Sequence, residues 1–198
     1  MVYYNVGGRE LSFATDRGVF SKGGVDFGSR LLIKTAISEG YSGRTLDMGC
    51  GYGPVGISLY THNPGIELVM ADINKRAVEL CRKNVELNIS SANKANGSGI
   101  EVICSDGFSG ISPPDADPRY FDYIFLNPPI RAGKGVVYRL YGECHANLEA
   151  GGHSYVVIQK KQGMSSSIKE LQRLFGNCEK TAKQSGYYVL HSKRPLPD

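Results

Sequence analysis

A glycine-rich segment is the strongest candidate ligand-binding feature of the chain: Asp47-Met-Gly-Cys-Gly-Tyr-Gly-Pro-Val-Gly56. It follows a short apolar run at 44–48 and precedes a helix-like segment at 55–62. Gly49, Gly51 and Gly53 allow a tight turn and a close backbone approach to a ligand, with helix N–H groups facing it. Because GYGPVG also matches GxGxxG, these residues alone leave dinucleotide binding open.

Two further acids follow the next apolar runs. Asp72 closes the run at 66–71, where a carboxylate can accept hydrogen bonds from both hydroxyls of a ribose. Asp106 follows the run at 100–105 and is a candidate for an adenine amine; the alternative is a helix cap or turn residue. Together they indicate a nucleotide-like ligand without choosing which one.

The most specific motif is Asn127-Pro128-Pro129-Ile130, at the end of the apolar run 123–127. Two prolines stop a buried strand and fix a rigid turn. We expect that turn to present the Asn127 amide oxygen and the Pro128 carbonyl to a crevice. Two acceptors that face one point suit an –NH₂ substrate, although an isolated motif of this kind can be a structural turn only.

The surrounding pattern predicts the elements that position these residues. Strands 2–6 and 10–15 form a hairpin around Gly7 and Gly8, and a helix extends to about Ser38. Strands are expected at 44–48, 66–71, 100–105, 123–127, 153–159, 178–183 and 187–192, and helices at 55–62, 74–88, 135–148 and 167–175. Ser167 with Glu170 resembles a capping box that opens the last helix. The alternation predicts a mostly parallel sheet covered on both faces, with an antiparallel edge.

Composition sets the class of protein. A chain of 198 residues with 41% hydrophobic content fits one α/β domain, with no apolar run long enough to span a membrane and no secretory signal. Five cysteines without a CxxC pair or metal-ligand spacing indicate reduced thiols in a cytoplasm and no metal site. The net charge of +4 is uneven: residues 151–198 hold 8 Lys and Arg against 3 Asp and Glu. This bias is too small to establish nucleic-acid binding by itself.

The motifs taken together resemble the small-methyltransferase domain of RsmC-type class I S-adenosylmethionine (SAM)-dependent methyltransferases, which make N2-methylguanosine in small-subunit ribosomal RNA. The resemblance rests on DMGCGYGPVG, Asp72, Asp106 and NPPI. It extends over residues 11–191 through VFSKGGVDFGSRLL (19–32), NPPIRAGKGVVYRLY (127–141) and VVIQKKQGMSS (156–166). Many members of the wider group have Tyr or Phe after NPP. Ile130 matches the guanine-N2 branch but removes that stacking ring.

The resemblance implies a Rossmann-like fold with a mostly parallel seven-stranded sheet, an antiparallel edge strand and an N-terminal β-hairpin. It implies one domain over 1–198, in which 1–38 form the hairpin, a lid loop and a helix, and 39–198 form the core. The cofactor is expected to be SAM, bound by Asp47, Gly49, Gly51, Gly53, Asp72, Asp106, Asn127, Phe20 and Ser21. The lid would extend to Lys22, Phe27, Gly28 and Ser29. Asn127, Pro128, Pro129 and Ile130 would be catalytic, and the RNA would contact Arg131, Lys134, Gln159, Lys160 and Lys161.

One departure and several alternatives remain. RsmC-type enzymes carry a second, degenerate methyltransferase domain that helps to hold RNA, and this chain resembles the single-domain relatives instead. The expected partner is ribosomal RNA or the small ribosomal subunit. The alternatives are a methyltransferase acting on a protein glutamine or on adenine, an NAD-linked oxidoreductase, and a non-catalytic RNA-binding or ribosome-assembly module with a residual SAM site.

Overall fold

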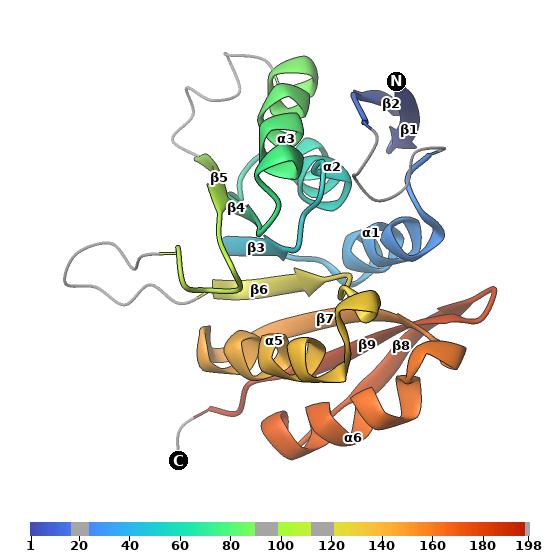
Figure 1. The fold of residues 1–198 in the computed structure, drawn as a ribbon, viewed down its shortest axis with the longest axis vertical. Coiled ribbons are helices and arrows are strands. Elements are labelled where there is room, and N and C mark those ends of the chain that lie inside the picture. Colours follow the sequence, from blue (N-terminus) through green and yellow to red (C-terminus); the bar gives the residue numbers. More distant parts are fainter. Residues whose placement is uncertain (17–23, 90–98, 112–120, 197–198) are drawn as a thin grey trace.

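The computed structural model describes residues 1–16, 24–89, 99–111 and 121–196. Seven strands form one sheet in the order β5-β4-β3-β6-β7-β9-β8 (Figure 1). Their bounds are β3 Arg44–Met48, β4 Glu67–Asp72, β5 Ile100–Cys104, β6 Phe121–Leu126, β7 Leu148–Gln159, β8 Glu179–Gln184 and β9 Tyr187–Lys193. The first five strands in this order are parallel, whereas β9 runs antiparallel to both of its neighbours. The predicted parallel sheet with an antiparallel edge is therefore confirmed.

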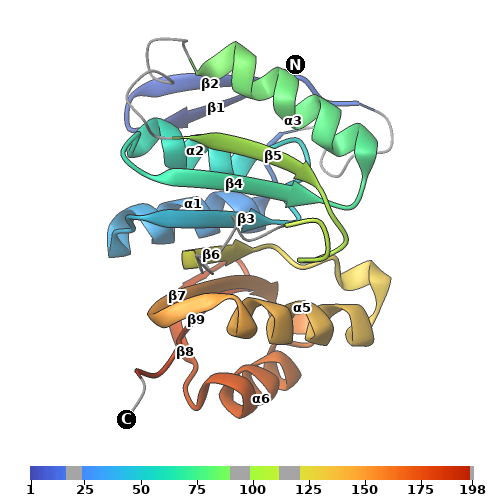
Figure 2. The ribbon, with the colours of Figure 1, turned by 90° about the vertical axis from the view of Figure 1, so that its left-hand side faces the viewer.

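Helices cover both faces of the sheet. One face packs against α1 (Phe27–Glu39), α2 (Pro54–His62) and α3 (Lys75–Asn88), and the other against α5 (Lys134–Ala146) and α6 (Met164–Phe175). Figure 2 shows α5 and α6 beside the part of the sheet formed by β7, β9 and β8. Two apolar clusters result, one on each face. Among the described helices, none is long and apolar enough to cross a membrane.

Central strands are apolar on both faces because both faces are covered. In β3, Leu46 and Met48 are buried in the cluster formed with α5 and α6. The side chain of Asp47 points to the opposite face, since side chains alternate along a strand, and its carboxylate contacts the backbone of α2. One short strand thus contributes apolar side chains to one core and a buried carboxylate to the other.

The N-terminal hairpin consists of β1 (Val2–Val6) and β2 (Arg9–Phe13), joined at Gly7 and Gly8, both with positive φ as the two-residue turn requires. Isolated two-stranded hairpins are only marginally stable, so docking must stabilise this one. Two asparagines of α3 provide polar contacts for that docking. Asn88 accepts from Ser12 N (2.9 Å) and donates to Ser12 O (2.9 Å). Asn84 does the same with Ala14, at 2.7 and 3.0 Å.

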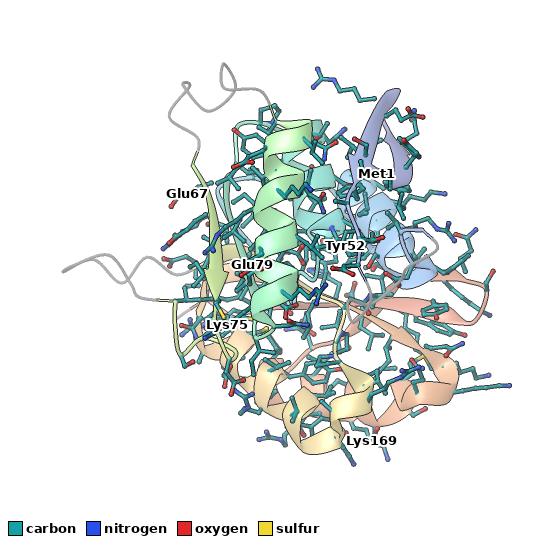
Figure 3. All side chains as sticks on the ribbon, turned by 45° about the horizontal axis from the view of Figure 1, so that its top comes forward. Met1, Tyr52, Glu67, Lys75, Glu79 and Lys169 are labelled. Carbon is teal, nitrogen blue, oxygen red and sulfur yellow. The ribbon has the colours of Figure 1, made fainter. Side chains whose placement is uncertain are left out.

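Asn84 also connects the hairpin to the glycine-rich segment. Its Nδ2 donates to Tyr52 O at 2.8 Å, and the side chain is fully buried. The ring of Tyr52, labelled in Figure 3, packs edge-on against Phe13 at a centroid distance of 5.8 Å. The Asn84 amide therefore joins α3 to the segment after β2, through Ala14, and to the glycine-rich segment, through Tyr52.

Two local expectations were wrong. The helix predicted at 167–175 begins a turn earlier, at Met164, which is buried, so Ser167 and Glu170 form no capping box. Ser167 is instead buried and accepts a hydrogen bond from the Tyr141 hydroxyl at 3.1 Å, and Glu170 pairs with Arg173. Gly176 ends the helix in a left-handed conformation, as predicted.

Phe27, Gly28 and Ser29, expected in a lid loop, form the first turn of α1, while Phe20, Ser21 and Lys22 lie outside the described residues.

We predict that Asn84→Ala lowers the free energy of unfolding by roughly 2–4 kcal/mol, because it removes three hydrogen bonds and leaves buried backbone groups unpaired. Urea unfolding followed by circular dichroism measures the change. Asn5→Ala is the matched control: it removes one exposed hydrogen bond, to Gly8 N, and is expected to cost less than about 1 kcal/mol. Equal losses in the two variants would contradict the role assigned to Asn84.

Candidate active site

Three glycines between β3 and α2 have left-handed backbone conformations. The φ values of Gly49, Gly51 and Gly53 are 69°, 57° and 92°. At Gly53 a Cβ would also lie 2.8 Å from both Cys81 Sγ and Ile57 Cδ1. The left-handed backbone therefore favours glycine at all three positions, and at Gly53 the close packing excludes a side chain as well. Pro54 is the first residue of α2, where the absence of an N–H is no loss.

Two carboxylates hold this loop. Asp47 Oδ2 accepts from Gly56 N in the first turn of α2 at 2.8 Å, and Asp72 Oδ2 accepts from Gly51 N at 2.9 Å. Asp47 is only 2% exposed, and burial raises the pKa of its carboxyl to about 7, with the nearby Asp72 charge acting in the same direction. Asp72 is only partly buried, and its Oδ1 accepts from Asn74 N at 2.8 Å. Asp47 thus holds the loop from the buried interior, and the partly buried Asp72 holds it from the side that solvent reaches.

A cavity of about 730 Å³ lies against this loop. Its size is within the range of small-molecule sites. The carboxyl ends of β3, β4, β6 and β7 contribute to its wall, as expected for ligand sites in parallel sheets. The lining includes most of the residues singled out from the sequence: Asp47, Gly49, Gly51, Asp72, Asp106, Asn127, Pro128, Pro129, Ile130, Arg131 and Gln159. Segments far apart in sequence therefore meet at one cavity.

The proline motif forms a compact turn directly after β6, which ends at Leu126. Pro128 O accepts from Ile130 N at 2.9 Å, around Pro129 with φ −75° and ψ 77°, the geometry of an inverse γ-turn. A short 3-10 helix, η1 (Ile130–Ala132), follows. A carbonyl oxygen has two lone pairs, so Pro128 O retains one acceptor site beyond this internal bond.

Asn127 is held through its amide nitrogen. Its Nδ2 donates to Ser29 Oγ at 3.1 Å and to Asp26 Oδ1 at 3.3 Å, both at the start of α1. All three side chains line the cavity. These bonds use the nitrogen side of the amide and leave Oδ1 as the amide atom available to a ligand.

Asp106 carries a partner that the sequence analysis missed. Its Oδ1 accepts from Arg139 Nη2 of α5 at 2.6 Å, and Arg139 Nη1 donates to Glu143 at 2.8 Å. Hydrogen bonding to Asp106, and then to Glu143, raises the pKa of the Arg139 guanidinium. Arg139 and Glu143 stand four residues apart on a helix, a spacing visible in sequence, but their approach to Asp106 depends on the fold.

The predicted RNA-contact residues divide into two groups. Arg131 is exposed and lines the cavity together with Gln159. In the described part of the chain, Lys134, Lys160 and Lys161 lie outside the cavity lining. Lys134 begins α5, with its ammonium 4.9 Å from the centre of the Tyr138 ring, and the other two belong to the exposed 3-10 helix η2 (Lys160–Gln162). The lining also includes Gln162 and Tyr187, which the sequence did not single out.

Candidate metal ligands do not gather here. Over residues 1–16, 24–89, 99–111 and 121–196, no group of three or more His, Cys, Asp or Glu residues could hold a metal ion. The five cysteines, all among these residues, are free thiols.

Solved structures with this arrangement are methyltransferases. The 16S rRNA N2 G1207 methyltransferase (RsmC) of T. thermophilus, in complex with AdoMet and guanosine, is 26% identical, with a TM-score of 0.80 over 97% of this chain and 49% of that one. A methyltransferase from Pyrococcus furiosus, 19% identical, has a TM-score of 0.61 over 84% of this chain and 81% of that one. The fold is therefore that of Rossmann-like SAM-dependent methyltransferases.

The methyltransferase small domain family model matches residues 10–191, and the chain belongs to this family. The uncharacterized protein YbxB of Bacillus subtilis is 40% identical over 94% of this chain and 87% of its own length. Ribosomal RNA small subunit methyltransferase C of Vibrio cholerae is 33% identical over 94% of this chain and 51% of its own. The chain thus spans about half the length of the two RsmC relatives and most of the length of YbxB.

The cofactor of this family, SAM, fits the residues present. A partly buried carboxylate at the end of β4 offers acceptors for ribose hydroxyls, and the left-handed glycines leave backbone open to a close ligand. Asp72 and Asp106 both border the same cavity, and the exposed side chain of Ile73 adds an apolar surface to its lining. Which of these groups contacts the cofactor remains a prediction.

If Asp72 accepts the ribose hydroxyls, Asp72→Ala is expected to weaken SAM binding by roughly 2–4 kcal/mol, because charge-assisted hydrogen bonds are lost and Gly51 N loses its partner. Calorimetric titration with SAM measures this change. The matched control is Glu79→Ala, which removes an exposed carboxylate of α3 outside the cavity lining (Figure 3). Equal affinity in Asp72→Ala and wild type would place the ribose elsewhere.

Proposed function

We propose that this protein transfers a methyl group from SAM to an exocyclic amine of an RNA base, and that the base is guanine in ribosomal RNA, methylated at N2. The observation that carries the proposal is the Asn127 amide, whose nitrogen is engaged by α1 so that its oxygen is the atom available in the cavity. Family membership, and relatives named as ribosomal RNA methyltransferases, support the choice of RNA.

The reaction asks little acid–base chemistry of the protein. The cofactor supplies a methyl group already activated on a sulfonium sulfur. In the proposed transfer, the lone pair of the amine nitrogen would form the bond to this carbon, and the carbon–sulfur bond would break with its electrons going to sulfur. The proton of the resulting ammonium then leaves to water. The protein aligns the two reacting atoms and provides acceptors for the positive charge that grows on nitrogen.

Asn127 Oδ1 and the remaining lone pair of Pro128 O are proposed to be those acceptors. Held in this way, both amine hydrogens would point at the motif, and the nitrogen lone pair would stay free to accept the methyl group. Ile130 would supply an apolar contact to the base in place of a stacking ring. A base inside paired RNA is inaccessible to such a site, so the target is single-stranded or flipped out.

The remaining assignments follow from this proposal. Residues 1–198 would act as a single methyltransferase domain, in which the hairpin, loop and helix of 1–38 accompany the core at 39–198. The partner would be ribosomal RNA or the small subunit, which places the protein in the cytoplasm. A protein glutamine and adenine also present an –NH₂ group, and the test below separates all three.

The direct test is mass spectrometry of ribosomal RNA nucleosides from cells with and without this protein. The proposal expects one N2-methylguanosine to disappear when the protein is absent and to return with the wild-type chain. Loss of a methyladenosine instead would replace guanine by adenine, and unchanged RNA with a lost methylglutamine would move the substrate to protein. Unchanged RNA and protein methylation would favour a non-catalytic module.

Asn127→Ala is expected to reduce methyl transfer by about 10²–10³-fold, the scale seen when one preorganised polar group is removed from a transition state. SAM affinity should change little, because the glycine loop, Asp72 and Asp106 remain. Single-turnover transfer of radioactive methyl to ribosomal RNA measures the rate. Full activity of the variant would exclude this motif as the amine site. Unfolding would require repetition with Asn127→Asp or Asn127→Ser.

Arg131→Ala is expected to weaken RNA binding and to reduce the slope of log affinity against log salt by roughly 0.7, the value for one phosphate contact to a single strand. Lys134→Ala should act in the same direction but less strongly, because Lys134 lies outside the cavity lining. Fluorescence anisotropy at several salt concentrations measures both. Lys169→Ala on α6 is the charge-matched control (Figure 3). A slope changed only by Lys160→Ala or Lys161→Ala would move the RNA contact to η2.

A further inference from the structure

The contact between α1 and the proline motif joins residues about a hundred positions apart. Asn127 Nδ2 is 3.1 Å from Ser29 Oγ and 3.3 Å from Asp26 Oδ1. Ser29 is 4% exposed, and Asp26 and Asn127 are partly buried. Because both acceptors also line the cavity, the contact is part of its wall and lies directly beside the proposed amine site.

The chemistry of this contact fixes which way the amide faces. An amide can turn by half a rotation and exchange its oxygen and nitrogen at little intrinsic cost. An ionised carboxylate can only accept hydrogen bonds, so it stabilises the orientation in which the NH₂ group of Asn127 faces Asp26. In the reversed orientation, amide oxygen would face carboxylate oxygen. The NH₂ group would then meet the substrate amine, donor against donor.

We propose that Asp26 and Ser29 are positioning residues that hold the Asn127 amide with its oxygen toward the substrate. They thereby make the site select nucleophiles that donate hydrogen bonds, such as –NH₂, over nucleophiles that only accept them. This inference rests on the proposed function, because it assigns Asn127 to the reacting amine. It adds the two residues of α1 that decide what Asn127 presents.

The first turn of α1 is built closely around this contact. Asp26 Oδ1 also accepts from Ser29 N at 3.1 Å and so caps the helix. At Gly28 a Cβ would lie 3.1 Å from Asp26 Oδ1 and 3.4 Å from the Tyr187 ring, so a side chain at this position would crowd the carboxylate. Since Asp26 both caps the helix and faces Asn127, the test must separate these two roles.

Ser29→Ala separates them, because it removes the hydroxyl acceptor and keeps the backbone N–H that Asp26 caps. We expect kcat on ribosomal RNA from cells lacking this protein to fall by about 3–10-fold, the worth of one hydrogen bond, with SAM affinity unchanged. Asp26→Ala should lower kcat by roughly 10–100-fold, because a hydrogen bond to a charged group is lost. Asp26→Asn keeps an oxygen for the cap but can also turn an NH₂ group toward Asn127, so it should recover only part of that loss.

Two controls distinguish positioning from a general structural effect. Thr35→Val removes another buried hydroxyl of α1, which donates to Leu31 O at 2.8 Å away from the motif, and should leave kcat unchanged. In the Asn127→Ala background, Ser29→Ala and Asp26→Ala should lower kcat no further, because there is no amide left to orient. Full additivity in that background, or an equal effect of Thr35→Val, would overturn the inference.

A measurement without substrate keeps the inference separate from the proposed function. The two Nδ2 protons of Asn127 give a side-chain amide signal in a ¹⁵N–¹H spectrum, assigned by its loss in Asn127→Ala. We expect this signal to shift, and its exchange with water to accelerate, in Ser29→Ala and Asp26→Ala but not in Thr35→Val. If the wild type methylates no RNA, the proposed function fails and this spectrum alone decides the orientation. An unmoved signal in both variants would overturn the positioning role.

Discussion

The hydrogen bond from Gly56 N to the buried Asp47 carboxylate fixes where α2 begins, and the geometry of the site depends on it. Gly56 has no room for a side chain, because a Cβ there would lie 2.5 Å from Met70 Sδ. The loop between these two residues is thus anchored at both ends, by the sheet and by the helix. Its three glycines adopt left-handed conformations, which allow so short a segment to connect the strand to the helix. Asp72 and Asn84 then hold its middle, through Gly51 N and Tyr52 O.

The order of strands divides the cavity wall into two halves. β3 pairs with β4 on one side and with β6 on the other. The chain therefore runs from β3 outward to β4 and β5, and then crosses back to place β6 on the other side of β3. In the first half, Asp72 ends β4 and Asp106 comes shortly after β5; in the second, Asn127 follows β6 and Gln159 ends β7. The acids suited to a nucleoside and the amide suited to an amine therefore face a common space from opposite sides of one central strand.

Local patterns were enough to predict the sheet, the hairpin and a set of site residues most of which line the cavity, because these depend on periodicity, on glycine and on proline. Short apolar runs that end in polar residues place Asp72 and Asn127 at strand ends from the local sequence alone. The partners of those residues were missed for a different reason. Asp26 and Asn127 are 101 residues apart, and Asp106 and Arg139 are 33 apart, so only the packing of α1 and α5 brings them together.

Local reasoning also failed where tertiary burial overrode it. Ser167 has the residue type of a helix cap, but the buried Met164 extends the helix past it, and its hydroxyl bonds to Tyr141 instead. Lys160 and Lys161, by contrast, follow β7 in the short helix η2 and are exposed to solvent, so their contact with RNA stays a prediction.

The asparagine contacts between α3 and the hairpin also bear on the order of events during synthesis. Ser12 and Ala14 are bound by amides 76 and 70 positions later in the chain. The hairpin leaves the ribosome before α3 and therefore has no docking partner until α3 has emerged, and a lone hairpin is only marginally stable in water. Closing that long loop is an entropic cost that local contacts do not offset. The hairpin is thus synthesised before the helix whose amides hold it in place.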